Sequence, residues 1–366
     1  MNSQSFFYSQ CDAARKLMKN KFLIFLIFLF FGCTLPKADR FQPEDNKLPI
    51  DELLLHVNYI LKELKSQGFS VVIATPEKNR INMAVKINGQ EGRLLLDTGA
   101  SFTSLSNRYL KRFQLSEYAY MEGRNPSIRT YLGGEIKDSF PTKAEKFEIG
   151  NRVFHPWPFV VLHKTRMKHG LLGVDFLHFT SSVIICRAGA VFLAPDGQPA
   201  RNIGRELKKF GYTEIELLMS DGLGGIDIKR QMEGYDRLLR SGVFVVPISF
   251  EGIEGMALLD TGAPYTSIDK FLSKKTDKRM KYHPHVRFMD VKGKSARVSS
   301  ICLTNLCVGD YCLEDQQYVA VIDHSSANKK RGLKAKSPLA GVIGFDILAS
   351  NNAIIDFGNR RLYMQK

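Results

Sequence analysis

The sequence predicts a mainly β protein made of two equivalent lobes with few helices. Three observations support this fold class: a long segment occurs twice without gaps, the same shorter motifs follow each copy, and short apolar stretches alternate with glycine-bearing turns. A chain of 366 residues is long enough for two domains. We place the first lobe at 51–198 and the second at 199–366, with an insert near 220–240.

The repeated segment begins as a strand–turn–strand unit. Residues 87–104 align with residues 250–267 at a constant separation of 163 positions. In each copy the chain turns at Gly89 or Gly252 and returns through an apolar strand into Asp-Thr-Gly-Ala. Asn-Gly, as found before the first return strand, is a strong hairpin signal.

Further motifs follow each copy in the same order. A glycine-bearing hairpin tip is expected next, and then a short strand pair. An apolar-apolar-Gly motif closes each unit, Leu171-Leu172-Gly173 in the first and Val342-Ile343-Gly344 in the second. A repeat of this extent indicates two copies of one fold.

The paired Asp-Thr-Gly motifs carry the chemistry. Asp97 and Asp260 each follow an apolar strand that is expected to cross a lobe core, so each carboxyl emerges at its edge. If a pseudo-twofold axis brings them together, like charges about 3 Å apart cannot both ionise and one proton is shared. Such a pair can hold a water molecule, with one carboxylate acting as base and its neighbour as acid.

The duplicated Asp-Thr-Gly-Ala with its downstream partner motif resembles the aspartic proteases. The short lobes are similar to the retropepsin-like (retroviral-type) branch and its bacterial relatives, and the duplication in one chain resembles the two-lobed pepsin arrangement. The resemblance covers residues 80–366. It implies two homologous closed β-barrel-like lobes of the aspartic protease fold.

The same resemblance implies an aspartic-type endopeptidase that hydrolyses peptide bonds with a water activated between two carboxylates. The partner is then a peptide or protein substrate in the cleft between the lobes. No cofactor and no metal are expected, a monomer with both Asp in one chain is favoured, and no nucleic-acid partner is expected. Two alternatives stay open: a non-catalytic peptide- or protein-binding surface lipoprotein using the same cleft, and lobes that pair between two chains.

Residue roles follow from the resemblance. Asp97 and Asp260 form the catalytic pair, with support from hydroxyls that donate across the lobe interface and from backbone N–H groups near the carboxylates; the support residues are Thr98, Gly99, Thr261 and Gly262. A hairpin over the substrate is expected around Tyr131 and Gly133 in lobe one and Gly293 in lobe two, although an ordinary surface hairpin fits these residues as well.

Alanine stands directly after both Asp-Thr-Gly motifs, at Ala100 and Ala263, where the pepsin branch has Ser or Thr. The missing hydroxyl removes a hydrogen bond that favours an ionised carboxylate. We therefore expect a pH optimum less acidic than that of gastric-type enzymes.

The N-terminal segment 1–32 resembles a bacterial lipoprotein signal. Ten apolar residues, Phe22–Phe31, follow a short basic stretch and precede Gly32-Cys33; ten are too few to span a bilayer as a helix. Met18 is an alternative start. Lipidation of Cys33 would leave 33–50 as a tether and anchor the protein to a bacterial membrane, in the periplasm or at the cell surface. An ordinary secretory signal is the alternative.

Four cysteines remain beyond Cys33. A two-residue turn at Gly309-Asp310 would set Cys307 opposite Cys312, as a cross-strand disulfide requires. Free thiols and a metal site remain the alternatives, although the spacing of Cys302, Cys307 and Cys312 matches no common zinc pattern.

The formal net charge of +15 favours anionic partners in general. The densest basic stretches are 274–281 and 329–336, and neither carries a nucleic-acid motif. Solvated loops and an anionic partner are both open for them.

Overall fold

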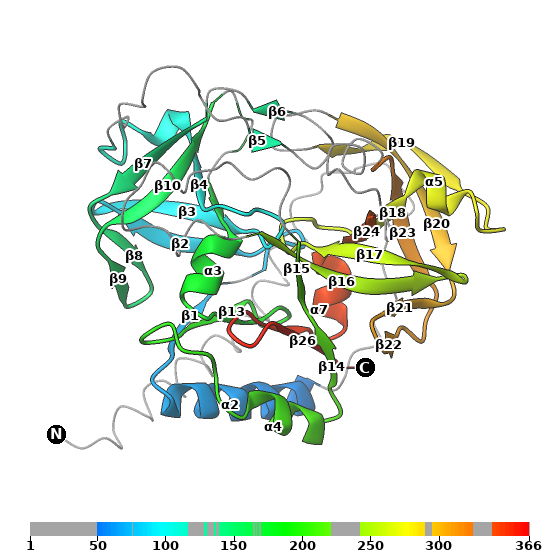
Figure 1. Ribbon diagram of the computed structural model, residues 1–366, viewed down its shortest axis with the longest axis horizontal. Helices are drawn as coiled ribbons and strands as arrows, with labels where there is room; N and C mark the ends of the chain where they lie inside the picture. The colour runs from blue at the N-terminus through cyan, green and yellow to red at the C-terminus, as the bar shows by residue number, and fades with distance from the viewer. Residues whose placement is uncertain are drawn as a thin grey trace, which may run out of the picture. The chain divides into compact units, whose positions relative to one another are not determined.

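The structure of the chain is a computed structural model (Figure 1). Its described part contains two lobes with the same strand order. The structure describes residues 50–74, 76–115, 128–129, 135–136, 139–163, 165, 167, 170–220, 242–289, 295–324 and 339–365. The signal segment, the tether, the insert near 220–240 and the hairpin tips at Tyr131, Gly133 and Gly293 lie outside these residues, apart from Ile50 and Ser220 at their margins.

The first lobe is an eight-stranded sheet in the order β7-β10-β4-β11-β3-β2-β8-β9. Its strands are β2 (Asn82–Ile87), β3 (Gln90–Leu96), β4 (Ser104–Ser106), β7 (Phe140–Ala144), β8 (Phe147–Ile149), β9 (Arg152–Phe154), β10 (Trp157–Leu162) and β11 (Gly170–Leu172). The helix α3 (Val174–Phe179) and the 3₁₀ turn η1 (Asn107–Tyr109) complete it, and β5 (Ile128–Arg129) pairs with β6 (Glu135–Ile136) separately.

The second lobe repeats this order as β20-β23-β18-β24-β17-β16-β21-β22, with β19 added beside β20. Its elements are β15 (Leu218–Ser220), β16 (Val243–Phe250), β17 (Ile253–Leu259), β18 (Ser267–Asp269), α5 (Lys270–Ser273), β19 (Lys281–Met289), β20 (Ser295–Leu303), β21 (Leu306–Val308), β22 (Tyr311–Cys312), β23 (Gln317–Ile322), β24 (Leu339–Ile343) and α7 (Phe345–Ser350). β15 pairs with β16.

The predicted fold class is confirmed: the protein is mainly β, with few helices and two equivalent barrel-like lobes. In the first sheet, β7 and β9 are the two edge strands and do not pair with each other, so this sheet forms a partial barrel. Along these strands the apolar side chains face the cores; in β2, for example, Met83, Val85 and Ile87 are buried while Ala84 and Lys86 are exposed. This alternation is the period of a strand with one face on a core.

A third sheet joins the lobes. Its order is β1-β13-β12-β25-β26-β14, with three strands from each lobe placed symmetrically about the β12–β25 pair, where Ile184 lies opposite Ile355. The strands are β1 (Ser70–Ile73), β12 (Val183–Ile185), β13 (Ala190–Leu193), β14 (Thr213–Glu216), β25 (Ile354–Asp356) and β26 (Arg361–Met364).

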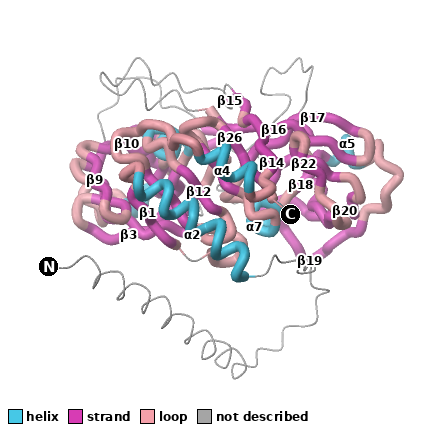
Figure 2. Tube along the Cα trace, turned by 90° about the horizontal axis from the view of Figure 1, so that it is seen from below, coloured by secondary structure: helices cyan, strands magenta, loops and turns pink. Residues whose placement is uncertain are grey.

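Two helices cover this joining sheet. Figure 2 shows α2 (Ile50–Ser66) lying across β1 and β12 with α4 (Ile203–Lys209) beside it. Val57, Ile60 and Leu64 of α2 share one buried cluster with Phe192 of lobe one and Tyr363 of lobe two. The helix α2 therefore packs on strands of both lobes. No helix among the described residues has the length and apolar character needed to cross a membrane.

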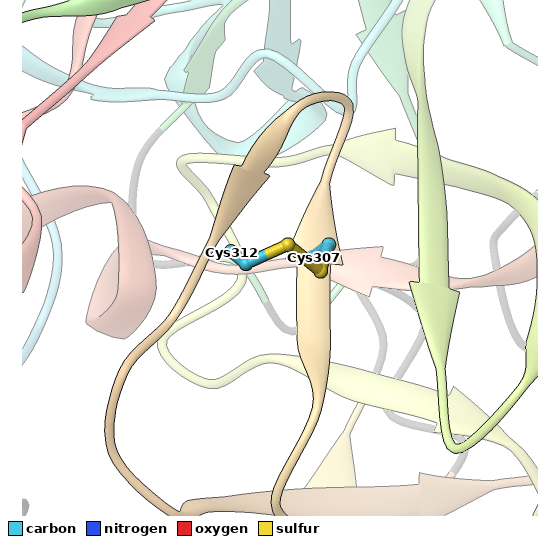
Figure 3. The surroundings of a disulfide bond; sticks show 2 residues. All are labelled: Cys307 and Cys312. Carbon is cyan, nitrogen blue, oxygen red and sulfur yellow. A yellow bond between two sulfur atoms is a disulfide. The ribbon is translucent and has the colours of Figure 1, made fainter.

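The second lobe carries a disulfide at the β21–β22 hairpin (Figure 3). Cys307 and Cys312 lie opposite each other in register, with their Cα atoms 4.0 Å apart and their sulfurs bonded. Of the two free cysteines in the described part, Cys186 is buried and Cys302 is half-buried. Burial raises the pKa of the Cys186 thiol to about 12, so it remains protonated and apolar in character.

Candidate active site

The two Asp-Thr-Gly loops leave the carboxyl ends of equivalent strands. β3 ends at Leu96 and β17 ends at Leu259, and each is paired in parallel with the apolar-apolar-Gly strand of its own lobe. The backbone N–H of Asp97 donates to the carbonyl of Leu172 at 3.0 Å, and that of Asp260 donates to Ile343 at 3.0 Å. The downstream motifs therefore hold the start of each loop.

Two threonines join the loops across the lobe interface. The hydroxyl of Thr98 donates to the Leu259 carbonyl at 2.7 Å and accepts from the Thr261 N–H at 2.9 Å. The hydroxyl of Thr261 donates to the Leu96 carbonyl at 2.9 Å and accepts from the Thr98 N–H at 3.2 Å. Both threonines are fully buried. Four reciprocal bonds thus tie the two lobes at the base of the loops.

Glycine is required where each loop meets the opposite aspartate. A Cβ added to Gly99 would lie 2.5 Å from Cγ of Asp260, and one added to Gly262 would lie 2.6 Å from Cγ of Asp97. Real Cβ atoms do not come this close to another heavy atom. The loops therefore interlock, with the backbone of each lobe packed against the carboxyl group of the other.

The half-buried carboxyl groups of Asp97 and Asp260 lie side by side and share a hydrogen bond. Burial and the charge of Asp260 raise the pKa of Asp97 well above its ordinary value. Burial also raises the pKa of Asp260, but the hydrogen bond from Asp97 and the N–H groups of Gly262 and Ala263 oppose that rise. The two carboxyl groups therefore titrate as a coupled pair, and the larger rise is in the pKa of Asp97.

Each carboxyl group accepts hydrogen bonds from backbone N–H groups of its own loop. Oδ1 of Asp260 accepts from Gly262 N–H at 2.8 Å and from Ala263 N–H at 3.1 Å. Oδ1 of Asp97 accepts from Gly99 N–H at 2.9 Å. The N–H of Ala100 also favours the charged form of Asp97, so each carboxyl group is stabilised by two backbone donors of its own loop.

A threonine–aspartate pair lies below each loop, buried in lobe one and partly buried in lobe two, and sequence reasoning missed both. In lobe one, Oδ1 of Asp175 accepts from the N–H and hydroxyl of Thr103 at 2.8 and 2.7 Å. In lobe two, Oδ1 of Asp346 accepts from the same groups of Thr266, both at 2.8 Å. Burial raises the pKa of Asp175 to about 6 and raises that of Asp346.

These pairs reach the loops through glycine. The N–H of Gly173 donates to the Thr103 hydroxyl at 3.1 Å, and that of Gly344 donates to the Thr266 hydroxyl at 2.9 Å. The pairs thus fix the strands that hold Asp97 and Asp260. The signal was present in the sequence, because an Asp stands two residues after each of these glycines in both copies.

The predicted flap residues lie outside the described part of the chain. In lobe one the flanking strands β5 and β6 pair antiparallel, with Ile128 opposite Ile136 and Arg129 opposite Glu135. In lobe two β19 and β20 pair up to Met289 and Ser295. The strands on either side of both tips are therefore hairpin arms, and a role over the substrate for Tyr131, Gly133 and Gly293 stays a prediction.

The first lobe matches a known protein family. The family model described as "gag-polyprotein putative aspartyl protease" matches residues 83–178. This match makes the first lobe similar to an aspartyl protease family. Among solved structures the chain is similar to a retropepsin-like aspartic protease from Rickettsia conorii, at 18% identity and a TM-score of 0.26, over 34% of this chain and 91% of that one. No curated protein sequence matches the chain.

A segment outside the repeat also approaches the aspartyl loops. Residues 76–81 precede β2, and the side chain of Asn79 donates to the Pro264 carbonyl of the other lobe at 3.3 Å. The exposed guanidinium of Arg80 lowers the pKa of Asp260 through its charge. Arg80 is thus a source of asymmetry between two otherwise equivalent loops.

Proposed function

We propose that the chain is an aspartic endopeptidase whose two lobes together form one catalytic site. The observation that carries this proposal is the shared hydrogen bond between Asp97 and Asp260 inside a frame of reciprocal cross-lobe bonds. A paired carboxylic acid and carboxylate can activate water without a metal or a covalent intermediate. The family match of the first lobe to an aspartyl protease supports the same chemistry.

We assign the shared proton to Asp97, whose pKa is raised more, and this assignment sets the two roles in the first step. Asp260, the ionised member, takes a proton from a water molecule as the water oxygen attacks the peptide carbonyl carbon. Asp97 gives its proton to the carbonyl oxygen, which becomes the second hydroxyl of a tetrahedral diol. After this step Asp260 is protonated and Asp97 is ionised.

The second step reverses both proton transfers. Asp260 protonates the leaving nitrogen as the C–N bond breaks, and Asp97 takes a proton from one diol hydroxyl as the new carboxyl group forms. The pair returns to its starting state with the proton on Asp97. The substrate that fits this site is an extended peptide between the lobes, held by β-type backbone hydrogen bonds.

The finer parts of the proposal concern location and assembly. We place the enzyme outside the cytoplasm of a bacterium, as a monomer held on a membrane by lipid on Cys33. The apolar run before Gly32-Cys33 supports the anchor, and the intrachain bonds between the lobes support the monomer. Cell fractionation with a high-salt wash, with and without a Cys33→Ser substitution, tests the anchor, because only the lipid-anchored parent should stay in the membrane fraction after the wash.

Cleavage of a mixed peptide library tests the enzymatic proposal. The chain from residue 34 onward would be assayed from acid to neutral pH, with a statine-type inhibitor and with a metal chelator in parallel. We expect cleavage that the statine-type compound blocks and the chelator leaves unchanged. A folded protein that cleaves no peptide at any pH would contradict the proposal and favour a peptide-binding lipoprotein.

Enlarging Gly99 is expected to disrupt the carboxyl pair. In Gly99→Ala the new methyl group would fall within 2.8 Å of all three carboxyl atoms of Asp260. We expect at least a roughly hundredfold loss of kcat, since a displacement of about 1 Å at a catalytic group has that effect. Gly89→Ala is the control: Gly89 has a φ of +78°, so the substitution strains the β2–β3 turn, but nothing lies within 4 Å of the added methyl group. Cleavage rates should separate the two variants. Equal rates would show that the interlocked loops are not needed for activity.

Removing the charge of Arg80 is expected to move the acidic limb of the pH–rate profile to higher pH. Arg80 lowers the pKa of Asp260, so Arg80→Gln lets that pKa rise and the base is lost at a higher pH as the solution is acidified. The same substitution at Arg93, an exposed residue on β3, is the control. Profiles of kcat/KM against pH give the result, and an unchanged acidic limb in Arg80→Gln would rule out this influence.

A further inference from the structure

The second lobe carries a basic and apolar surface that has no role in the proposed peptidase chemistry. This surface runs from α5 to the start of β19 and consists of Lys270, Phe271, Lys274, Lys275, Arg279, Met280, Lys281 and Tyr282, all exposed. We call it the α5 patch. Its aromatic side chains are unusually open for a protein surface, with Phe271 68% exposed and Tyr282 51% exposed.

The local fold holds Phe271 outward. Asp269 caps α5 by accepting from the N–H groups of Phe271 and Leu272 at 2.8 and 3.2 Å. Leu272 and Ser273 are buried, so the other side of this short helix, with Lys270 and Phe271, faces solvent. The exposure of Phe271 is therefore a consequence of a fixed, capped helix.

The basic residues gather around the same point. Nζ of Lys275 lies 5.2 Å from the ring centre of Phe271, and the Ser273 hydroxyl contacts the sulfur of Met280 at 3.8 Å, which brings the segment after the helix back to it. Within 270–282 there are six basic residues and one acidic residue, Asp277. Of these, Lys278 pairs with Glu251 at 3.6 Å, and the rest of the stretch keeps a strong positive balance.

Exposed aromatic and apolar side chains surrounded by Lys and Arg match the chemistry of an anionic bilayer surface. Lysines and arginines are attracted to acidic headgroups, while aromatic rings and methionine enter the boundary between headgroups and acyl chains. Neither an ordinary solvated loop nor a purely electrostatic partner requires the exposed Phe271. We propose that the α5 patch docks the second lobe on a membrane that contains anionic phospholipid.

The chain length before α2 is compatible with this docking. Ile50 stands 17 positions after Cys33, and an extended chain of this length spans at most about 60 Å. This exceeds the radius of gyration of about 20 Å expected for a folded unit of this size. A lipid on Cys33 and the α5 patch could therefore engage the same membrane, but the patch does not depend on the lipid.

Vesicle binding tests the proposal. The chain from residue 34 onward contains the whole compact unit Asp45–Lys366 and carries no lipid. It would be sedimented with vesicles of phosphatidylcholine alone and of equimolar phosphatidylcholine and phosphatidylglycerol, at low and high salt. We expect binding to the anionic vesicles that weakens with salt, and a reduction by roughly tenfold or more in Lys274→Glu/Lys275→Glu and in Phe271→Ser.

The control keeps the net charge equal. Lys62→Glu/Lys65→Glu changes two exposed lysines on α2 by the same amount and should bind like the parent. Equal losses in both double variants would overturn the patch in favour of overall charge, and parent protein that binds neither vesicle, or binds only a nucleic acid, would overturn it as well. Cleavage of a short soluble peptide should be unchanged in all variants, so a failure of docking is distinguishable from a failure of the peptidase.

Discussion

Asp97→Asn and Asp260→Asn are each expected to reduce kcat for peptide cleavage by at least about 10³-fold. General acid and general base catalysis each contribute about 10²–10⁴-fold, and one carboxyl group of this pair serves in both roles during the cycle. Asparagine keeps the size of the side chain and therefore the packing of the opposite glycine. Initial rates on a peptide cleaved by the parent give the measurement.

Stability distinguishes loss of chemistry from loss of fold in these variants. Both pKa values are raised by burial, so the folded state binds the proton more tightly than the unfolded state does. Ionisation at neutral pH therefore costs folding free energy, and this cost grows as the pH rises above the ordinary value of the group. The Asn variants should unfold at the same temperature as the parent or a higher one at pH 7. A variant that retains more than a tenth of the parent rate would contradict the catalytic assignment.

Thr98→Val combined with Thr261→Val is expected to lower the free energy of unfolding by about 3–6 kcal/mol. The double variant removes four bonds between the lobes and leaves the carbonyls of Leu96 and Leu259 and two N–H groups without these partners. A buried polar group without its partner costs about 1–3 kcal/mol, and the effects in one network do not add fully. Urea unfolding followed by circular dichroism measures the change.

Serine provides the matched control at both positions. Thr98→Ser with Thr261→Ser keeps the hydroxyls and removes only a methyl group from each buried side chain, so its loss should be clearly smaller. Catalysis should follow the same order, because the threonines set the distance between the two loops. Equal stability of the valine and serine variants would show that the cross-lobe bonds do not hold the lobes together.

The duplication made most of the fold predictable. Because residues 87–104 and 250–267 align without gaps, any strand placed in one copy was expected in the other, and the two sheets have the same strand order. The cross-lobe bonds of Thr98 and Thr261 followed from the family resemblance. The packing partner of α2 could not be predicted in this way, because the sheet beneath the helix is assembled from strands of both lobes and exists only after the lobes meet.

The asymmetry of the site could not be predicted from the repeat. Asp97 and Asp260 have the same neighbours in sequence, yet Arg80 and Asn79 come from a segment outside the alignment and reach only the second loop. The roles of Thr103 with Asp175 and of Thr266 with Asp346 depend on contacts 72 and 80 residues apart along the chain. Their recurrence in both copies was visible, but recurrence alone does not separate a core residue from one that holds the site.

The central claim is that Asp97 and Asp260 of the same chain form one catalytic site. Mixing the two inactive variants, Asp97→Asn and Asp260→Asn, at equal concentration tests it most directly, with the parent and each single variant assayed beside the mixture on the same peptide. The account predicts that the parent cleaves and that neither variant nor the mixture does, at any protein concentration. Recovery of activity in the mixture would contradict it, because an intact pair could then form only between lobes of different chains.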